Sequence, residues 1–132
     1  MQLDLRSLDR LKDIHQDLIT VINTAALIHN EVKTGWGFVV TEGRRTLERQ
    51  RQLVASGASK TLKSRHLTGH AVDLAVYLSS PKDIRWDWPM YNRLSLLIKS
   101  AARHADVPIE WGGDWKTFKD GPHFQLPQSK YP

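Results

Sequence analysis

Four side chains suited to metal chemistry lie in two short segments of the sequence. In the first, His66 and Asp73 are seven positions apart with a glycine between them, and in the second Asp120 precedes His123 by three positions. Two histidines and one aspartate form a suitable ligand set for a catalytic zinc, which uses three protein ligands and leaves the fourth position to water. The remaining carboxylate could then accept the proton of that water. The two segments together indicate a zinc site that activates water.

The surroundings of Asp73 bear on this interpretation. Residues 71–78 are apolar apart from Asp73 and predict a strand. A carboxylate buried in such a strand without a partner is very costly. An ion pair with an arginine or ligation of a metal would each supply the partner. We favour metal ligation because it explains Asp73 and His66 together.

Two adjacent arginines, Arg44 and Arg45, lie in a predicted turn between a strand and a helix. Phe38–Thr41 reads as a short buried strand, and Thr46 can cap a helix from Leu47 to about Ser56. An arginine in such a turn is well placed to face a cleft, although a surface position is the more common outcome for an arginine.

The remaining elements follow from the spacing of apolar residues. A helix is predicted over about 8–29 with Ser7 as its cap, and another over about 91–105, because apolar residues recur there at three- and four-residue steps. Short strands are expected near 107–111 and 121–126. The 132 residues contain no repeat or linker, so we expect one domain with about three helices.

The charge of the chain favours an anionic partner. The net charge is +5 and the pI is about 9.7, which suits nucleic acid, an anionic membrane surface or an anionic cell-wall polymer. Residues 44–65 contain seven basic residues and one acidic residue. The same stretch is equally compatible with a solvated basic face, so the charge alone does not select the partner.

Several classes of protein are disfavoured by the composition. Without cysteine there are no disulfides, thiolate ligands or cysteine nucleophiles. No apolar run approaches the length of a membrane span. The first residues lack the basic and apolar regions of a secretion signal, so we expect the protein to be made in the cytosol and released by another factor.

The motifs taken together resemble a known family. They are similar to those of the zinc D-Ala-D-Ala carboxypeptidases and L-alanyl-D-glutamate peptidases, and within that family to the short phage endolysins. The resemblance covers about residues 36–126 and is carried by three segments: Ser64-x-His66-x-x-Gly69-x-Ala71-x-Asp73, Trp111-Gly112-Gly113-Asp114-Trp115, and Asp120-x-x-His123, beside Gly43-x-Arg45-Thr46.

The resemblance implies a role for each matching residue. His66, Asp73 and His123 would bind Zn²⁺, and Asp120 would be the catalytic carboxylate. Arg45 would help to stabilise the polarised carbonyl. The residues assigned to substrate binding are Ser64, Arg44 and Trp115. Arg44 departs from the apolar or aromatic residue common before the family's arginine, and Trp115 alone suits either the core or a cleft wall.

The resemblance also implies the fold and the reaction. It predicts an α+β fold in which the helices pack on a small, mainly antiparallel sheet carrying the zinc, within a single peptidase domain of residues 1–132 and catalytic motifs over 43–126. The implied activity is hydrolysis of the L-Ala–D-Glu bond of peptidoglycan stem peptides by metal-activated water. Cleavage at D-Ala-D-Ala is the alternative within the family, because the metal motif does not specify the bond.

Two alternatives outside this chemistry are weaker. A basic nucleic-acid-binding module would leave the four metal-type residues unexplained, so no nucleic-acid partner is expected. An inactive relative that only binds the wall would not need Asp120. We expect a monomer that contacts stem peptides and an anionic outer-membrane surface, and that reaches the periplasmic wall from the host cytoplasm through holin-type release.

Overall fold

A five-stranded antiparallel sheet forms the centre of the computed structural model, which describes residues 1–132. Strand β2 (Ala71–Leu78) is its middle strand, with β1 (Trp36–Glu42) along one edge. The other edge of β2 is shared by β5 (His123–Gln125) and β3 (Ile84–Arg85), and β4 (Glu110–Trp111) pairs with β5. The predicted strands and the α+β class are therefore confirmed.

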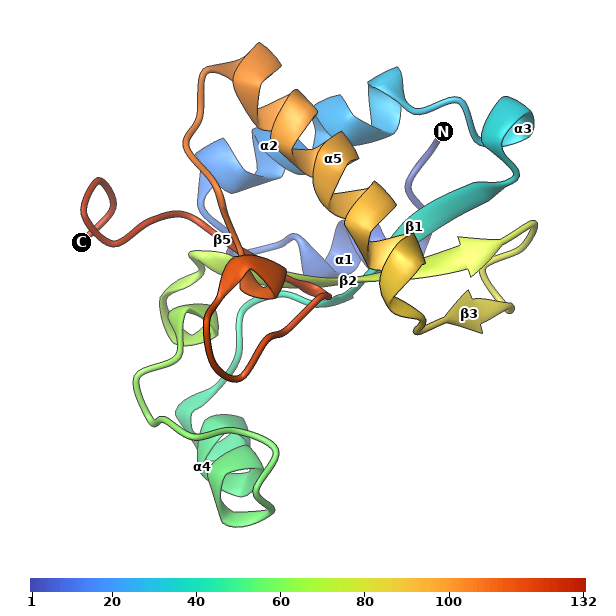
Figure 1. The fold of residues 1–132 in the computed structure, drawn as a ribbon. Helices are drawn as coiled ribbons and strands as arrows, with labels where there is room; N and C mark the ends of the chain where they lie inside the picture. Colours follow the sequence, from blue (N-terminus) through green and yellow to red (C-terminus); the bar gives the residue numbers. More distant parts are fainter.

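Two long helices cover one face of this sheet (Figure 1). They are α2 (Gln16–Ile28) and α5 (Trp88–Ala105), which pack against each other. Their buried side chains, such as Leu18 and Ile98, join the alternate residues of β1 and β2 that point toward them in one core. Burial of this apolar surface is the main source of stability. No helix is both long enough and apolar enough to cross a membrane.

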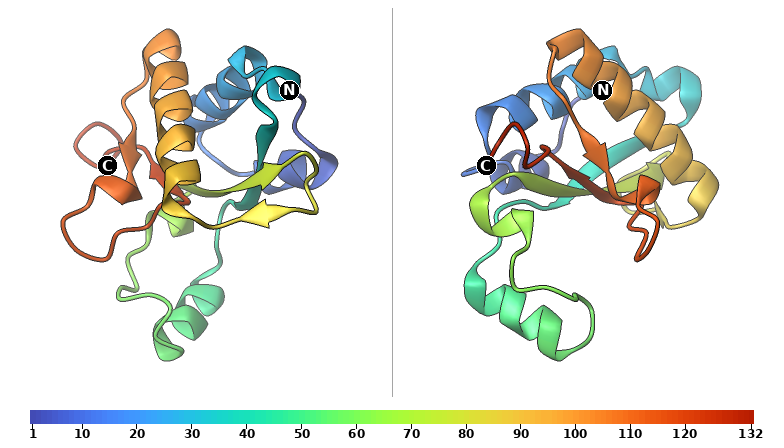
Figure 2. Two further views of the ribbon diagram at one scale, coloured as in Figure 1. Left: turned by 45° about the vertical axis from the view of Figure 1, so that its right-hand side comes forward. Right: turned by 60° about the vertical axis from the view of Figure 1, so that its left-hand side comes forward.

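The opposite face of the sheet carries the site-bearing residues. Along β2, Val72, Leu74 and Val76 belong to the main core, whereas Ala75 and Tyr77 belong to a separate small cluster. Because side chains alternate along a strand, Asp73 points away from the two long helices. On this side residues 43–64 form an arm that contains helix α4 (Leu47–Ala55). The arm stands apart from the rest of the molecule (Figures 1 and 2).

The arm begins as the sequence predicted. Thr46 is the cap of α4, and its hydroxyl accepts a hydrogen bond from the Arg49 amide. A 3-10 helix, η1 (Arg65–Thr68), returns the chain from the arm to β2, and a second one, η2 (Gly112–Asp114), follows β4. Only Gln50 is buried in α4, so polar contacts rather than the core fix this arm.

The N-terminal helix expected over about 8–29 is wrong as a continuous element. It is two helices, α1 (Leu5–Arg10) and α2, followed by the short α3 (Glu31–Thr34), so five α-helices replace the expected three. Asp13 has a positive φ of 65° in the break, and the Gly69 carbonyl accepts a hydrogen bond from the His15 amide. A side chain at Gly69 would place its Cβ 2.5 Å from the Asp13 carbonyl oxygen. The break thus lets the N-terminal segment pack against the motif glycine.

The predicted cap of that helix is also wrong. Asp4 caps α1 by accepting a hydrogen bond from the Ser7 amide. Ser7 is fully buried inside the helix, and its hydroxyl accepts a hydrogen bond from the Val40 amide of β1. Ser7 therefore joins α1 to the sheet rather than starting the helix.

Candidate metal centre and active site

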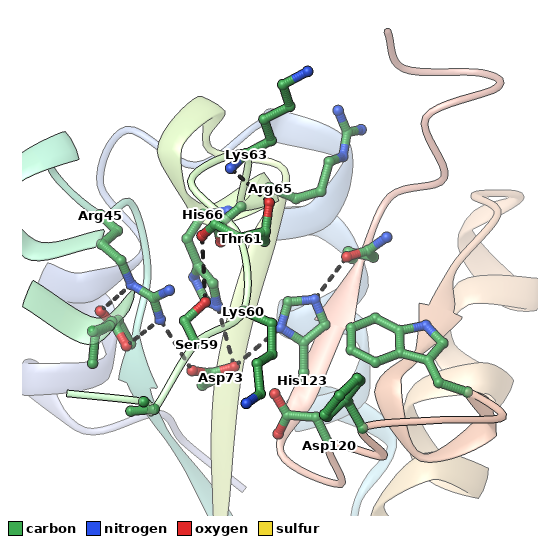
Figure 3. Close-up of a pocket in the computed structure, with 18 residues that line it drawn as sticks. Arg45, Ser59, Lys60, Thr61, Lys63, Arg65, His66, Asp73, Asp120 and His123 are labelled. Atoms are coloured by element: carbon green, nitrogen blue, oxygen red, sulfur yellow. Dashed lines mark hydrogen bonds and ion pairs between the residues drawn. The ribbon is translucent and has the colours of Figure 1, made fainter. Parts of the chain in front are cut away.

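Three side chains from three separate elements converge on the side of the sheet opposite the two long helices (Figure 3). His66 comes from η1, Asp73 from β2 and His123 from β5, and their ligand atoms all lie within 4.8 Å of one another. The inner nitrogens, His66 Nε2 and His123 Nδ1, are 3.2 and 3.4 Å from Asp73 Oδ1. This geometry brings together the three residues that the sequence suggested as metal ligands.

The outer nitrogens of both histidines are held by acceptors. His66 Nδ1 lies 2.8 Å from the Gly43 carbonyl oxygen, and His123 Nε2 lies 2.7 Å from Gln125 Oε1. Gln125 in turn donates to Glu110 on β4. Acceptors at the outer nitrogens fix the tautomer that leaves the inner nitrogens free as ligands, which is the usual support of a metal-binding histidine. The donor set and its support therefore fit a divalent metal such as zinc.

The charges of the cluster favour a cation in the same place. Burial raises the pKa of Asp73, but hydrogen bonds from His123 and His66 and their charges outweigh it and hold that pKa well below its usual range. Burial lowers the pKa of His123, and the contact with Asp73 outweighs it, so the net shift is upward. A lowered pKa favours the carboxylate form of Asp73, which suits a cation shared with the two histidines.

Arg45 faces this cluster from the start of the arm. Its Nε and Nη2 donate to the two carboxylate oxygens of Glu42 at 2.7 Å each, and Nη1 donates to Gln50 Oε1 at 2.7 Å. Nη2 also lies 3.7 Å from Asp73 Oδ2. The guanidinium is nearly buried. Asp73 therefore has an arginine as an ion-pair partner in addition to the two histidines.

Asp120 lies in the turn that leads into β5. The Asp120 amide donates to the Gly112 carbonyl, and the Asp120 carbonyl accepts from the His123 amide. Burial raises the pKa of the Asp120 carboxyl, and the negative charge of Asp73 adds to this, while His123, His66 and Arg45 only partly offset it. A carboxyl with a raised pKa beside a candidate metal centre has the properties of a proton carrier.

The comparisons with known proteins agree with this geometry. The family model described as phage L-alanyl-D-glutamate peptidase matches residues 1–126. The chain belongs to this family. It is 39% identical over 93 residues to an L-alanyl-D-glutamate peptidase of Listeria phage A118, covering 70% of this chain and 31% of that protein. The chain thus spans about a third of the length of that relative.

Two further relatives match most of their own length. The peptidoglycan L-alanyl-D-glutamate endopeptidase CwlK of Bacillus subtilis is 31% identical over 126 residues, covering 86% of this chain and 74% of CwlK. The crystal structure of the L-Ala D-Glu endopeptidase ChiX of Serratia marcescens is 41% identical, with a TM-score of 0.85 over 99% of this chain and 94% of ChiX. The predicted family and the α+β peptidase fold are confirmed.

A cleft of about 520 Å³ lies between the sheet and the arm, and most of the predicted site residues line it. Ser64 lines it and accepts a hydrogen bond from the His66 amide. Trp115 also lines it, with its ring centroid 5.0 Å from that of His123. Arg44 does not line the cleft and is exposed. Of the two adjacent arginines, Arg45 is the one that faces the site.

Three residues of the site were not found from the sequence. Glu42 and Gln50 accept hydrogen bonds from the Arg45 guanidinium, and Gln125 orients the His123 ring. A bulge in β1 just before Glu42 shifts the strand register, so that Glu42 lies opposite Asp73. A signal existed only for Gln125, which lies two residues after His123 and so shares its strand face.

Proposed function

We propose that this protein is a zinc-dependent peptidase that hydrolyses the L-Ala–D-Glu bond of peptidoglycan stem peptides. The observation that carries the proposal is the His66, Asp73 and His123 cluster on the wall of a cleft that also contains Asp120. The family membership and the similarity to ChiX and CwlK support the choice of bond. A zinc ion held by these three residues would have one further position for water.

A zinc ion held there would supply a water of pKa near 7 and would polarise the scissile carbonyl. Asp120 is the residue that moves protons: its carboxylate accepts the proton of the attacking water and passes it to the departing amine. Its raised pKa suits both steps, because a carboxyl that holds a proton too weakly could not return it.

Arg45 supplies fixed positive charge. Three of its guanidinium N–H groups bind Glu42 and Gln50, so two of the five donors remain for the cleft side. Because the guanidinium is already fixed by these contacts, its charge needs no reorganisation when negative charge develops on the substrate carbonyl. Ser64 and Trp115 bind substrate along the walls of the cleft.

The basic arm suits the anionic surroundings of this substrate. Stem peptides carry carboxylates, and the arm presents Arg44, Arg49 and Arg51 as exposed cations. The same surface would hold the protein against an anionic outer membrane. The protein acts on the periplasmic wall after holin-type release from the host cytoplasm, as a monomer and without nucleic acid.

The test is mass spectrometry of fragments released from purified peptidoglycan, with and without a chelator. New L-Ala carboxyl ends and D-Glu amino ends, lost on chelation and restored by Zn²⁺, are the expected result. Release of terminal D-Ala would move the specificity to the carboxypeptidase reaction. The absence of any new ends under either condition would overturn the proposal.

A further inference from the structure

A second, smaller cavity of about 190 Å³ adjoins the cleft. It is lined by Trp86 between β3 and α5, by Trp88 and Tyr91 of α5, and by Lys119 to Pro122 before β5. Asp120 lines both this cavity and the cleft. The two therefore meet at the residue that we propose as the proton carrier.

Two tryptophans at the mouth of this cavity are exposed. Trp86 is 63% and Trp88 is 47% exposed, although both are large aromatic side chains. The core does not depend on these two tryptophans, because α5 contributes the buried side chains of Leu94, Ile98 and Ala101 to it. Aromatic side chains left open beside a site are typical of ligand contact rather than of folding.

The aromatic surface is also preformed. Trp86 is nearly parallel to Tyr91, with ring centroids 6.0 Å apart and an interplanar angle of 5°. Tyr91 is buried, and its hydroxyl donates to the Arg85 carbonyl and accepts from the Val76 amide. Trp88 packs edge-on against Trp111 and close to Gly121, where a Cβ would lie 3.2 Å from the Trp88 ring. A ligand would thus meet rings whose positions are already fixed.

The chemistry of the cavity suits a sugar ring. A pyranose has an apolar C–H face that can stack on an aromatic ring and an equatorial rim of hydroxyl and acetamido groups. Lys119 supplies a cationic donor beside the rings and forms no ion pair. Aromatic rings with a lysine at their edge therefore suit a ligand that has both an apolar face and polar groups, such as a sugar, better than a purely apolar ligand.

The proposed substrate places a sugar next to the cleft. In peptidoglycan the L-Ala residue is joined to the lactyl group of a muramyl sugar, so the sugar is separated from the scissile bond by roughly two residue lengths, about 7 Å. We propose that the Trp86–Trp88 cavity is a glycan subsite that binds the muramyl sugar carrying the stem peptide. This inference rests on the proposed function, because that function fixes where the scissile bond lies.

The test compares two substrates that differ only in the sugar. Cleavage of a sugar-free stem tetrapeptide and of the same peptide attached to its disaccharide is measured for the wild type, Trp86→Ala and Trp86→Phe. The Ala variant should lose roughly three- to tenfold in kcat/KM, mainly through KM, on the disaccharide peptide only. The Phe variant keeps a stacking face and should recover most of the loss.

Two outcomes would overturn the subsite. An equal loss on both substrates would mean that Trp86 supports the cleft structurally, and no loss on either would mean that it contacts no sugar.

A binding measurement separates this inference from the proposed function. The peptide-free disaccharide is titrated into the wild type and Trp86→Ala while the indole N–H signals are followed by NMR. Shifts of the Trp86 and Trp88 signals in the wild type, with a much weaker shift of the Trp88 signal in the variant, which lacks the Trp86 indole, would support the subsite even if no peptide bond were cleaved. Unshifted signals would exclude it, whatever the hydrolytic activity proves to be.

Discussion

Asp73 and His123 lie directly opposite each other in the β2–β5 pair. Side chains of directly paired residues on one face of a sheet are held about 5 Å apart by the ladder itself. Two of the three candidate metal ligands are thus positioned by backbone hydrogen bonding rather than by loops. Only His66 comes from outside the sheet, and its ring is fixed by the Gly43 carbonyl.

Replacing His123 by Ala is expected to abolish stoichiometric zinc binding. The change leaves two protein ligands, and it also removes the ring that Gln125 orients. Zinc content after dialysis, measured by atomic emission, should fall to background, and hydrolysis of peptidoglycan should be lost with it. His104→Ala is the control, because His104 is exposed near the end of α5 and does not line the cleft. A His123→Ala protein that retained one zinc per chain would contradict the ligand assignment.

Replacing Asp120 by Asn should separate zinc binding from turnover. The amide keeps the shape of the carboxyl but cannot carry the proton, so we expect kcat to fall by about 10²–10⁴ while the zinc content stays near that of the wild type. Asp114→Asn is the matched control, since Asp114 is an exposed aspartate paired with Lys99. Near-normal turnover by the Asp120 variant would assign the proton transfer to another group.

Replacing Gln50 by Ala tests the support of Arg45. Gln50 is fully buried, accepts from Arg45 Nη1 and donates to Ser59 Oγ. Its removal leaves a buried guanidinium N–H without its acceptor, which costs about 1–3 kcal/mol in the free energy of unfolding. Urea denaturation should show this loss, with a decrease in kcat as Arg45 becomes mobile. Gln52→Ala, an exposed position on the same helix, should change neither quantity.

The sequence predicted those parts of the fold that depend on local signals. Thr46 caps α4, and the apolar run around Asp73 forms β2, because capping and alternation act over a few residues. The break between α1 and α2 escaped prediction because its cause is remote: the apolar spacing continues through it, and the chain turns there to contact Gly69.

In the site, too, some residues could be predicted from the sequence and others could not. The residues proposed as ligands were recognisable by type and spacing, and the structure brings them together. Gln50 and Glu42 were not recognisable, because a glutamine on a polar helix and a glutamate after a strand are ordinary in sequence. Their contacts with Arg45 depend on the turn between β1 and α4, which brings residues three and five positions away against its guanidinium.

The cap of α1 gives a prediction for the dependence of stability on pH. Burial raises the pKa of Asp4, but its hydrogen bonds with Ser7 and the charges of Arg10 and Arg6 outweigh this, so the folded-state pKa is below the usual 3.8. A group with a lowered pKa in the folded state contributes stability that is present above its unfolded pKa and is lost as the pH falls through the folded value. Asp4→Ala should therefore cost about 1 kcal/mol at pH 7, as is typical for a lost cap.

The difference between the wild type and Asp4→Ala, measured by urea denaturation, should be constant from pH 7 to about pH 5 and should shrink below the usual carboxyl pKa of 3.8. Asp4→Asn is the informative companion, because Asn is also a good cap but carries no charge. It should keep most of the stability at pH 7 and show a weaker pH dependence than the wild type. A difference between wild type and Asp4→Ala that grew as the pH fell would contradict the capping role, since a protonated carboxyl loses the charge that strengthens its bond to the Ser7 amide.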